Sequence, residues 1–319
     1  MAGHPILVTG AAGFAGCHLL ARFRSTDSER PLHAWSRRVR PDADRVQWHQ
    51  VEVTDRDAVR HAIVRTRPSH IVHLAGSPHV GQSWHSSLAP LKTNVLGTHY
   101  LLEAVRTHVP QCRVLVVTSA MIYRAGDALL DEEAPLEPAS PYGLSKLAQD
   151  QLALSAARDD GLDVLVARPF NHTGPSQSPE YAVSAFARQI ALIEAGLLPA
   201  EMRVGNLDAM RDMTDVRDVV DAYARLLTGG RSGCAYNICS GTTYRIGDLL
   251  DMLIGMAPLP ITRTVDAEQL RPSDLPRLAG DCSRLRNELG WTPRHPITTT
   301  LAETLHWWRM EVASGRVTA

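Results

Sequence analysis

The sequence predicts an α/β protein whose first half forms a doubly wound parallel sheet. Short, uninterrupted apolar runs alternate with helical patterns over the first 170 residues. Strands of this kind are typical of parallel sheets that helices cover on both faces. The chain has 319 residues, of which 44% are hydrophobic and 21% charged. One large domain or two intimately joined globular domains are therefore expected.

The elements of the first half can be assigned in order along the chain. A helix through Phe23 follows the glycines behind the first strand. Asp55 is a good N-cap for a second helix that Pro68 ends. A third helix covers about 91–109, and Pro141 suits the first turn of a fourth. The expected strands are 6–9, 32–35, 46–51, 71–74, 114–117 and 164–167.

Composition excludes several classes of function. The formal net charge is -1 and the basic residues are dispersed, so neither nucleic acid nor an anionic membrane is expected as a partner. The five cysteines form no Cys-x-x-Cys and the 14 histidines show no metal-helix spacing, which predicts neither a disulfide framework nor a metal site. No apolar run reaches membrane-spanning length and no cleavable signal opens the chain, so a cytoplasmic protein is expected.

A glycine-rich segment joins the first strand to the first helix. It reads Thr9-Gly10-Ala-Ala-Gly13-Phe-Ala-Gly16, with the spacing Gly-x-x-Gly-x-x-Gly. Glycines let the backbone approach a pyrophosphate, whose charge is favoured at a helix N-terminus. A tight turn without a ligand is the alternative, but the position directly after the first strand favours a dinucleotide. The expected contacts are Gly10, Ala12, Gly13, Phe14 and Ala15.

The end of the second strand indicates which dinucleotide binds. An acidic residue there binds the ribose hydroxyl of NAD, whereas an arginine accommodates the additional phosphate of NADP. This chain has Ser36-Arg37-Arg38 and no acid. We therefore expect Arg37 to contact the cofactor and NADP(H) to be preferred, with NAD(H) possible. The alternative is a solvated basic turn.

Tyr142 and Lys146 form a candidate proton-transfer pair. They are four residues apart in Tyr-Gly-Leu-Ser-Lys, so they share one face of the expected helix. A nearby ammonium favours the phenolate and lowers the pKa of a tyrosine from its usual value of about 10. Such pairs also arise by chance, so the surrounding motifs decide their weight.

These motifs together resemble the extended short-chain dehydrogenase/reductases, also called the NAD-dependent epimerase/dehydratase family. The similarity rests on the glycine segment, Ser119, and Tyr142 with Lys146, and on Leu74-Ala-Gly76 and Asn94 in Asn-Val-Leu-Gly-Thr. The second half is most similar to the GDP-4-keto-6-deoxy-D-mannose reductases. The segments that carry this similarity are Ala167-Arg-Pro-Phe-Asn-His-Thr-Gly-Pro175, Gly205 to Asp218 and Arg271-Pro-Ser-Asp-Leu-Pro-Arg277.

The resemblance implies roles for individual residues. Tyr142 would be the acid/base, Lys146 would lower its pKa and hold the nicotinamide ribose, and Ser119 would hydrogen-bond the reacting oxygen. Guanidinium groups suit diphosphate oxygens. The remaining residues that the resemblance assigns to the cofactor are Glu52, Val53, Leu74, Ala75, Gly76 and Asn94. Those assigned to the nucleotide sugar are Asn171, Arg211 and Arg271, and Arg188 is a weaker candidate for the same site. The resemblance also implies a homodimer that forms through the helices around Asn94 and Tyr142. The alternative is that the apolar residues of these helices are buried within one subunit.

The domain organisation follows from a change of texture after residue 170. Proline and glycine become frequent there and the elements shorten. We expect residues 1–170 to form the dinucleotide-binding Rossmann domain, with residues 215–240 returning to it. A smaller C-terminal α/β domain, made of residues 171–214 and 241–319, would bind the substrate.

Three departures from the family pattern narrow the expected reaction. Dehydratase relatives carry a glutamate where this chain has Met121, which cannot transfer a proton; Arg124 replaces a usual glycine and Gly76 a usual alanine. The leading hypothesis is NADPH-dependent reduction of the C4 keto group of GDP-4-keto-6-deoxy-D-mannose to GDP-D-rhamnose, with the talose-type product left open. The alternatives are a nucleotide-sugar 4,6-dehydratase or epimerase with tightly bound NAD(P), and a non-catalytic dinucleotide-binding module.

Overall fold

A seven-stranded parallel sheet forms the centre of the protein. The computed structural model describes residues 5–26, 30–38, 40–42, 45–77, 84, 86–126, 128–266 and 275–318. The strands lie in the order β10 (Ala235–Ile238), β6 (Val164–Pro169), β5 (Arg113–Val117), β4 (His70–His73), β1 (Ile6–Thr9), β2 (Leu32–Ser36) and β3 (Val46–Gln50). The order reverses between β1 and β4, where sheets of this kind bind ligands. The predicted doubly wound Rossmann-like sheet is confirmed.

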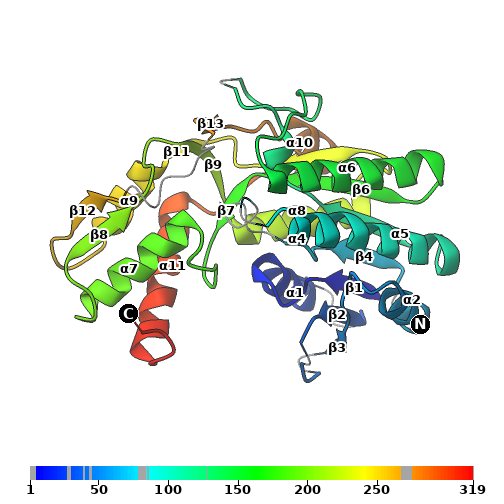
Figure 1. Ribbon diagram of the computed structural model, residues 1–319, viewed down its shortest axis with the longest axis horizontal. Helices are drawn as coiled ribbons and strands as arrows, with labels where there is room; N and C mark the ends of the chain where they lie inside the picture. Colours follow the sequence, from blue (N-terminus) through cyan, green and yellow to red (C-terminus); the bar gives the residue numbers. More distant parts are fainter. Residues whose placement is uncertain are drawn as a thin grey trace.

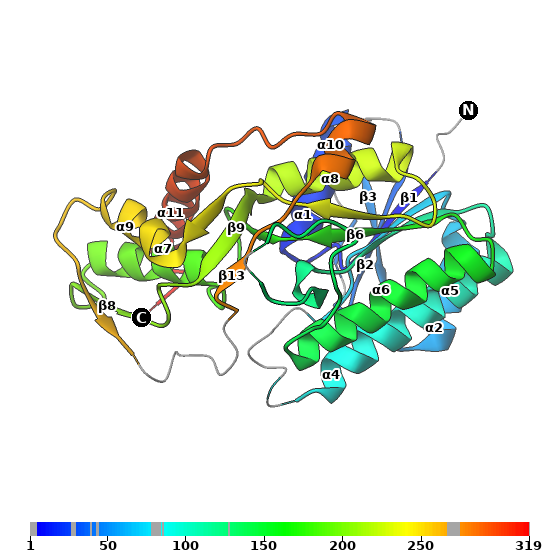
Figure 2. The ribbon, with the colours of Figure 1, turned by 90° about the horizontal axis from the view of Figure 1, so that it is seen from above.

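Helices cover both faces of this sheet, as Figure 2 shows. On one face α1 (Phe14–Thr26), α8 (Val216–Gly229) and α10 (Ser283–Leu289) contribute to an apolar core that includes Leu19, Val220 and Leu285. On the other face α2 (Arg56–Thr66), α5 (Gly97–His108) and α6 (Pro141–Asp159) enclose a second core that includes Ile63, Leu101 and Ala153. Apolar side chains therefore bury the sheet on both faces.

Local sequence signals explain where two of these helices begin and end. The Asp55 carboxylate accepts a hydrogen bond from the Ala58 N–H at 3.0 Å, which is the expected N-cap of α2. The helix ends at Thr66, and Arg67 takes a left-handed conformation before Pro68. At α6, Pro141 occupies the first turn as predicted, and the Ser140 hydroxyl caps the helix by accepting from the Gly143 N–H at 3.1 Å.

The helix expected at 91–109 is interrupted by a π turn. It consists of α4 (Leu88–Pro90), the π-helical segment η1 (Leu91–Leu96) and α5. The Gly97 N–H reaches back to the carbonyl of Lys92. Asn94 lies within this turn and is buried. Turns of this kind occur frequently at functional sites.

The remaining elements form a smaller unit beside the sheet (Figure 1). Its core, which includes Phe186, Leu250 and Leu305, lies between three helices. The helices are α7 (Ala182–Glu194), α9 (Ile246–Ile254) and α11 (Ile297–Ala313), and the strands are β7 (Asn171–Thr173), β8 (Glu201–Val204), β9 (Met210–Asp215), β11 (Thr243–Arg245), β12 (Thr262–Val265) and β13 (Arg277–Leu278). β9 pairs with β7, β11 and β13, and β8 pairs with β12. Within the expected returning segment, α8 packs on the large sheet and β10 is its edge strand.

The described residues contain neither a membrane-spanning helix nor a group of side chains suited to a metal ion. None of the helices there combines the length and apolar character needed to cross a membrane. No group of three or more histidine, cysteine or acidic side chains gathers there in a way that would hold a metal ion. The five cysteines are free thiols.

Candidate active site

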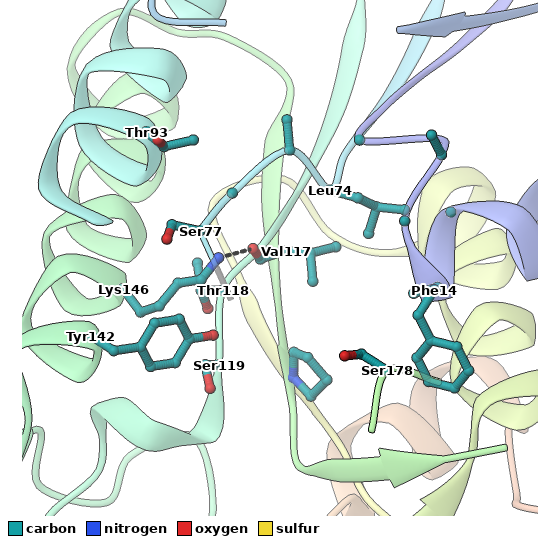
Figure 3. A pocket seen from close by; sticks show the side chains of 18 of the residues that line it. Phe14, Leu74, Ser77, Thr93, Val117, Thr118, Ser119, Tyr142, Lys146 and Ser178 are labelled. Carbon is teal, nitrogen blue, oxygen red and sulfur yellow. Dashed lines mark hydrogen bonds between the residues drawn. The ribbon is translucent and has the colours of Figure 1, made fainter. Parts of the chain in front are cut away.

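A cavity of about 1130 Å³ opens at the carboxyl ends of the sheet strands. Its walls come from the loop after β1, the ends of β2, β4 and β5, the start of α6 and the smaller unit. Figure 3 shows its interior, with Phe14 and Leu74 on one side and Tyr142 and Lys146 on the other. The sequence-predicted residues that line it are Gly10, Ala12, Gly13, Phe14, Ala15, Arg37, Glu52, Val53, Leu74, Ala75, Gly76, Ser119, Tyr142, Lys146, Asn171 and Arg211.

The glycine segment makes a tight turn that only glycines can form. Gly10 has φ +63°, and a Cβ there would lie 2.7 Å from the Ala75 nitrogen. A Cβ on Gly16 would lie 2.5 Å from the Gly10 carbonyl oxygen. The turn brings the N-terminus of α1 to the cavity wall, where free backbone N–H groups favour an anion. This cradle fits the pyrophosphate of a dinucleotide.

Basic side chains gather where the other end of a dinucleotide would lie. Arg37, Arg38 and Arg40 line the cavity beyond β2 and are exposed. In the described part of the chain, Arg37 has no carboxylate partner. The Glu52 carboxylate accepts hydrogen bonds from the N–H and hydroxyl of Thr54, at 3.2 and 3.1 Å. This end of the cavity therefore presents exposed guanidinium groups to a ligand.

The three expected catalytic side chains meet at the ends of β5 and α6. Figure 3 shows the Tyr142 hydroxyl and the Lys146 ammonium pointing into one space, with Ser119 beside them. All three side chains are buried in the wall of the cavity. Ser119 follows β5, and its Oγ accepts from the Met121 N–H at 3.1 Å. Lys146 Nζ donates to the Val117 carbonyl at 3.1 Å and to Gln149 Oε1 at 2.7 Å.

Burial sets the protonation of this pair. It raises the pKa of Tyr142 well above its ordinary value, with a smaller contribution in the same direction from Tyr181 and an opposing one from the Ser119 hydroxyl. It lowers the pKa of Lys146 to about 7, against the pull of the Asp150 carboxylate. The expectation of a lowered tyrosine pKa is wrong, because loss of hydration outweighs the hydrogen bond with the Ser119 hydroxyl. Tyr142 therefore keeps its proton at neutral pH, as a general acid must.

A buried ion pair between Arg168 of β6 and Asp150 of α6 lies next to the site. Arg168 donates to both carboxylate oxygens of Asp150, at 2.9 and 2.8 Å, and the Thr118 hydroxyl donates to the same carboxylate at 3.1 Å. Arg168 also donates to the Tyr123 hydroxyl at 3.0 Å. These contacts tie α6 to β6 and to Thr118, which lies between β5 and Ser119. They therefore fix the helix that carries Tyr142 and Lys146 relative to Ser119.

Asn94 serves the site from behind the cavity wall. It does not line the cavity. Its Oδ1 accepts from the Ser77 N–H at 2.9 Å, and its Nδ2 donates to Ser145 Oγ at 2.9 Å. Asn94 thus connects the loop after β4 to the helix that carries Tyr142. Gly76 leaves room for this contact, since a Cβ there would lie 2.8 Å from Asn94 Oδ1.

The residues expected to bind the nucleotide sugar divide into three groups. Asn171 and Arg211 line the cavity, and Arg211 donates to the Leu275 carbonyl at 2.6 Å. Arg188 does not reach the cavity, because α7 directs it towards the C-terminus, where it donates to the Thr318 carbonyl at 2.7 Å. Arg271 lies outside the described residues.

Several residues that sequence reasoning missed also line the cavity. His172 stacks on Phe14, with ring centroids 5.9 Å apart and planes 5° from parallel. Its place directly after Asn171 was the one signal available. Gln177, Ser178, Tyr181 and Tyr223 are among the others. They belong to the smaller unit and to α8, and tertiary packing brings them to the cavity. The spacing of residues in the sequence does not indicate such packing.

Comparison with known proteins gives one family and several kinds of relative. The family model described as GDP-mannose 4,6 dehydratase matches residues 7–304. The GDP-6-deoxy-D-mannose reductase of Pseudomonas aeruginosa is 33% identical over 96% of this chain and 98% of its own length. A dTDP-glucose 4,6-dehydratase of Streptomyces niveus is 31% identical over 95% of this chain and 92% of its own length.

Solved structures agree with this assignment. RMD from Pseudomonas aeruginosa, complexed with NADPH, superimposes with a TM-score of 0.86 at 32% identity and covers 97% of this chain and 99% of its own. MoeE5, in complex with UDP-glucuronic acid and NAD, gives 0.85 at 30% identity over 96% and 99%. The chain therefore belongs to the GDP-mannose 4,6 dehydratase family, and it is an NAD(P)-dependent enzyme of the extended short-chain dehydrogenase/reductase type.

Proposed function

We propose that this enzyme reduces the C4 keto group of GDP-4-keto-6-deoxy-D-mannose with NADPH and forms GDP-D-rhamnose. The observation that carries the proposal is the buried, protonated Tyr142 beside Ser119, with Met121 where a dehydratase would need a carboxylate. The 33% identity to a GDP-6-deoxy-D-mannose reductase over nearly the whole chain supports the same reaction.

The residues of the site have complementary tasks in this reaction. NADPH, when bound, would supply a hydride to the C4 carbon. Tyr142 donates its hydroxyl proton to the carbonyl oxygen, so that the alcohol O–H bond forms as the phenol O–H bond breaks. Ser119 donates a hydrogen bond to the same oxygen while negative charge develops on it. Lys146 holds the nicotinamide ribose, and its positive charge stabilises the phenolate that remains.

The binding residues are assigned by the chemistry they offer. The backbone around Gly10 and Gly13 would hold the pyrophosphate, and Arg37 the additional phosphate of NADPH. Arg211 offers a guanidinium, and Asn171 an amide, to the sugar diphosphate. Exposed leucines on the helices that carry Asn94 and Tyr142 support the expected homodimer: Leu88, Leu91, Leu96 and Leu144. Light scattering at micromolar concentration would test that assembly.

The decisive experiment is product analysis. The protein is incubated with NADPH and freshly made GDP-4-keto-6-deoxy-D-mannose, and the sugar is identified by NMR. Tyr142→Phe should lower turnover by ~10²–10⁴ and leave NADPH binding unchanged in a fluorescence titration. Tyr100→Phe, on α5 outside the cavity, is the matched control. Wild-type turnover in Tyr142→Phe would contradict the assignment.

A dehydratase is the second candidate, since dTDP-glucose 4,6-dehydratases are also relatives at 28–32% identity. The two reactions differ in cofactor use. A reductase consumes one NADPH for each product, whereas a dehydratase shows no net consumption of cofactor. Progress curves at 340 nm, with product quantified in parallel, separate them.

A further inference from the structure

Lys146 is anchored by a buried chain of hydrogen bonds that the reaction itself does not use. Its ammonium donates to Gln149 Oε1 at 2.7 Å, and Gln149 Nε2 donates to Thr98 Oγ1 at 2.8 Å. Thr98 Oγ1 lies 3.0 Å from His73 Nε2, and His73 Nδ1 lies 2.8 Å from Thr9 Oγ1. Gln149, Thr98, His73 and Thr9 are all fully buried.

The direction of each hydrogen bond in this chain can be deduced. Thr98 donates its single hydroxyl proton to the Asn94 carbonyl at 2.7 Å. Its oxygen must therefore accept from both His73 and Gln149. Hence the amino end of the Gln149 amide faces Thr98, and its carbonyl end faces the Lys146 ammonium, which can only donate.

The histidine is fixed in one tautomer by the same reasoning. His73 carries its proton on Nε2, so Nδ1 accepts from the Thr9 hydroxyl, whose oxygen accepts in turn from the Ala75 N–H at 3.1 Å. Burial, reinforced by the charge of Lys146, lowers the pKa of His73 to about 3. A neutral histidine is consistent with this tautomer throughout the working pH range.

We propose that Gln149 is the positioning residue of Lys146, and that Thr98 and His73 fix which end of its amide faces the ammonium. The inference rests on the proposed function, because it gives Lys146 a task that requires charge. In the part of the chain that the structure describes, the titratable groups that face Lys146 are Tyr142 and Asp150 of its own helix and His73 of β4, with Arg168 of β6 bound to Asp150.

The test measures the pKa of Lys146 directly. The chain contains two lysines, Lys92 and Lys146, so protein labelled with ¹³C-lysine gives two side-chain Cε signals. Lys92 is exposed, serves as the internal reference and is assigned with Lys92→Arg. The titration is recorded without substrate or cofactor, so its result does not depend on turnover.

Two substitutions at Gln149 should shift this pKa in opposite directions. Gln149→Leu removes one acceptor of the ammonium and leaves the Val117 carbonyl in place. The Lys146 pKa should then fall by about one to two units, the range for a hydrogen bond to a charged group. Gln149→Glu adds a negative charge, and the pKa should rise. Gln151→Leu, an exposed glutamine two residues further along α6, should leave it unchanged. A Lys146 pKa that stays at the wild-type value in both Gln149 variants would overturn the proposal.

Thr98 tests the orientation of the amide. Thr98→Val removes the shared acceptor, so the amide can turn and the Lys146 pKa should fall, whereas Thr98→Ser should restore the wild-type value. An unchanged pKa in Thr98→Val would contradict the role of Thr98. In active variants the alkaline limb of kcat/KM should move with the measured pKa. If the wild type is inactive, the reductase assignment fails, while the titration still decides the role of Gln149.

Discussion

The buried histidine of this hydrogen-bond chain makes the protein sensitive to acid. An unfolded histidine has a pKa of about 6.5, whereas burial lowers that of folded His73 to about 3. Below pH 6.5 the His73 imidazole is therefore protonated in the unfolded chain and remains neutral in the folded protein. The free energy of unfolding should fall by about 1.4 kcal/mol for each pH unit, and by about 5 kcal/mol in all by pH 3.

The assay compares wild type with His73→Asn, which cannot titrate. Urea unfolding is followed at fixed protein concentration between pH 6.5 and 4.5. Other groups titrate in this range too, so the quantity that matters is the difference between the two proteins. That difference should change by about 2 kcal/mol in favour of the variant as the pH falls. His306→Asn, at an exposed position on α11, is the control. Parallel curves for wild type and His73→Asn would refute a neutral, buried His73.

Three further predictions concern the cradle, the buried ion pair and the cofactor. Gly16→Ala should abolish NADPH binding in a fluorescence titration, because its Cβ would lie 2.5 Å from a backbone oxygen; binding at wild-type affinity would contradict the tight turn. Arg168→Met should lower the free energy of unfolding by about 3–5 kcal/mol, since it leaves the Asp150 carboxylate buried without its partner; denaturant titration measures this, and a loss below 1 kcal/mol would argue against it. Arg37→Glu should weaken NADPH binding about 10–100-fold and leave NADH binding nearly unchanged; equal losses for both cofactors would remove Arg37 from the phosphate site.

The parts of the fold that depend on local chemistry were predictable from the sequence. The alternation of apolar runs and helices indicates the parallel sheet, and Asp55 and Pro141 mark the starts of two helices. The glycine segment could also be placed, because its turn requires glycine at positions 10 and 16. In each case a short stretch of chain carries the whole physical cause.

The parts that depend on long-range packing were not predictable. The pKa of Tyr142 rises because of the depth at which the phenol is buried, which its spacing from Lys146 does not report. Arg188 has the right residue type but lies on a face of α7 that points away from the cavity. His172 reaches the site through its stacking on Phe14, far away along the chain.

The π turn at residues 91–96 changes which side of the long helix faces the cavity and which faces the core. The side chains before the turn are rotated about the helix axis relative to those after it. Each residue of an α-helix advances by about 100° around the axis, so the wider turn offsets the segment before it from the segment after it. Thr93 can therefore face the cavity while Leu101 and Val105 face the apolar core. Shortening this turn by one residue would rotate Thr93 and Asn94 about the helix axis relative to α5, so that they would face in another direction. The helix would still form, but its two halves could no longer serve the cavity and the core at once.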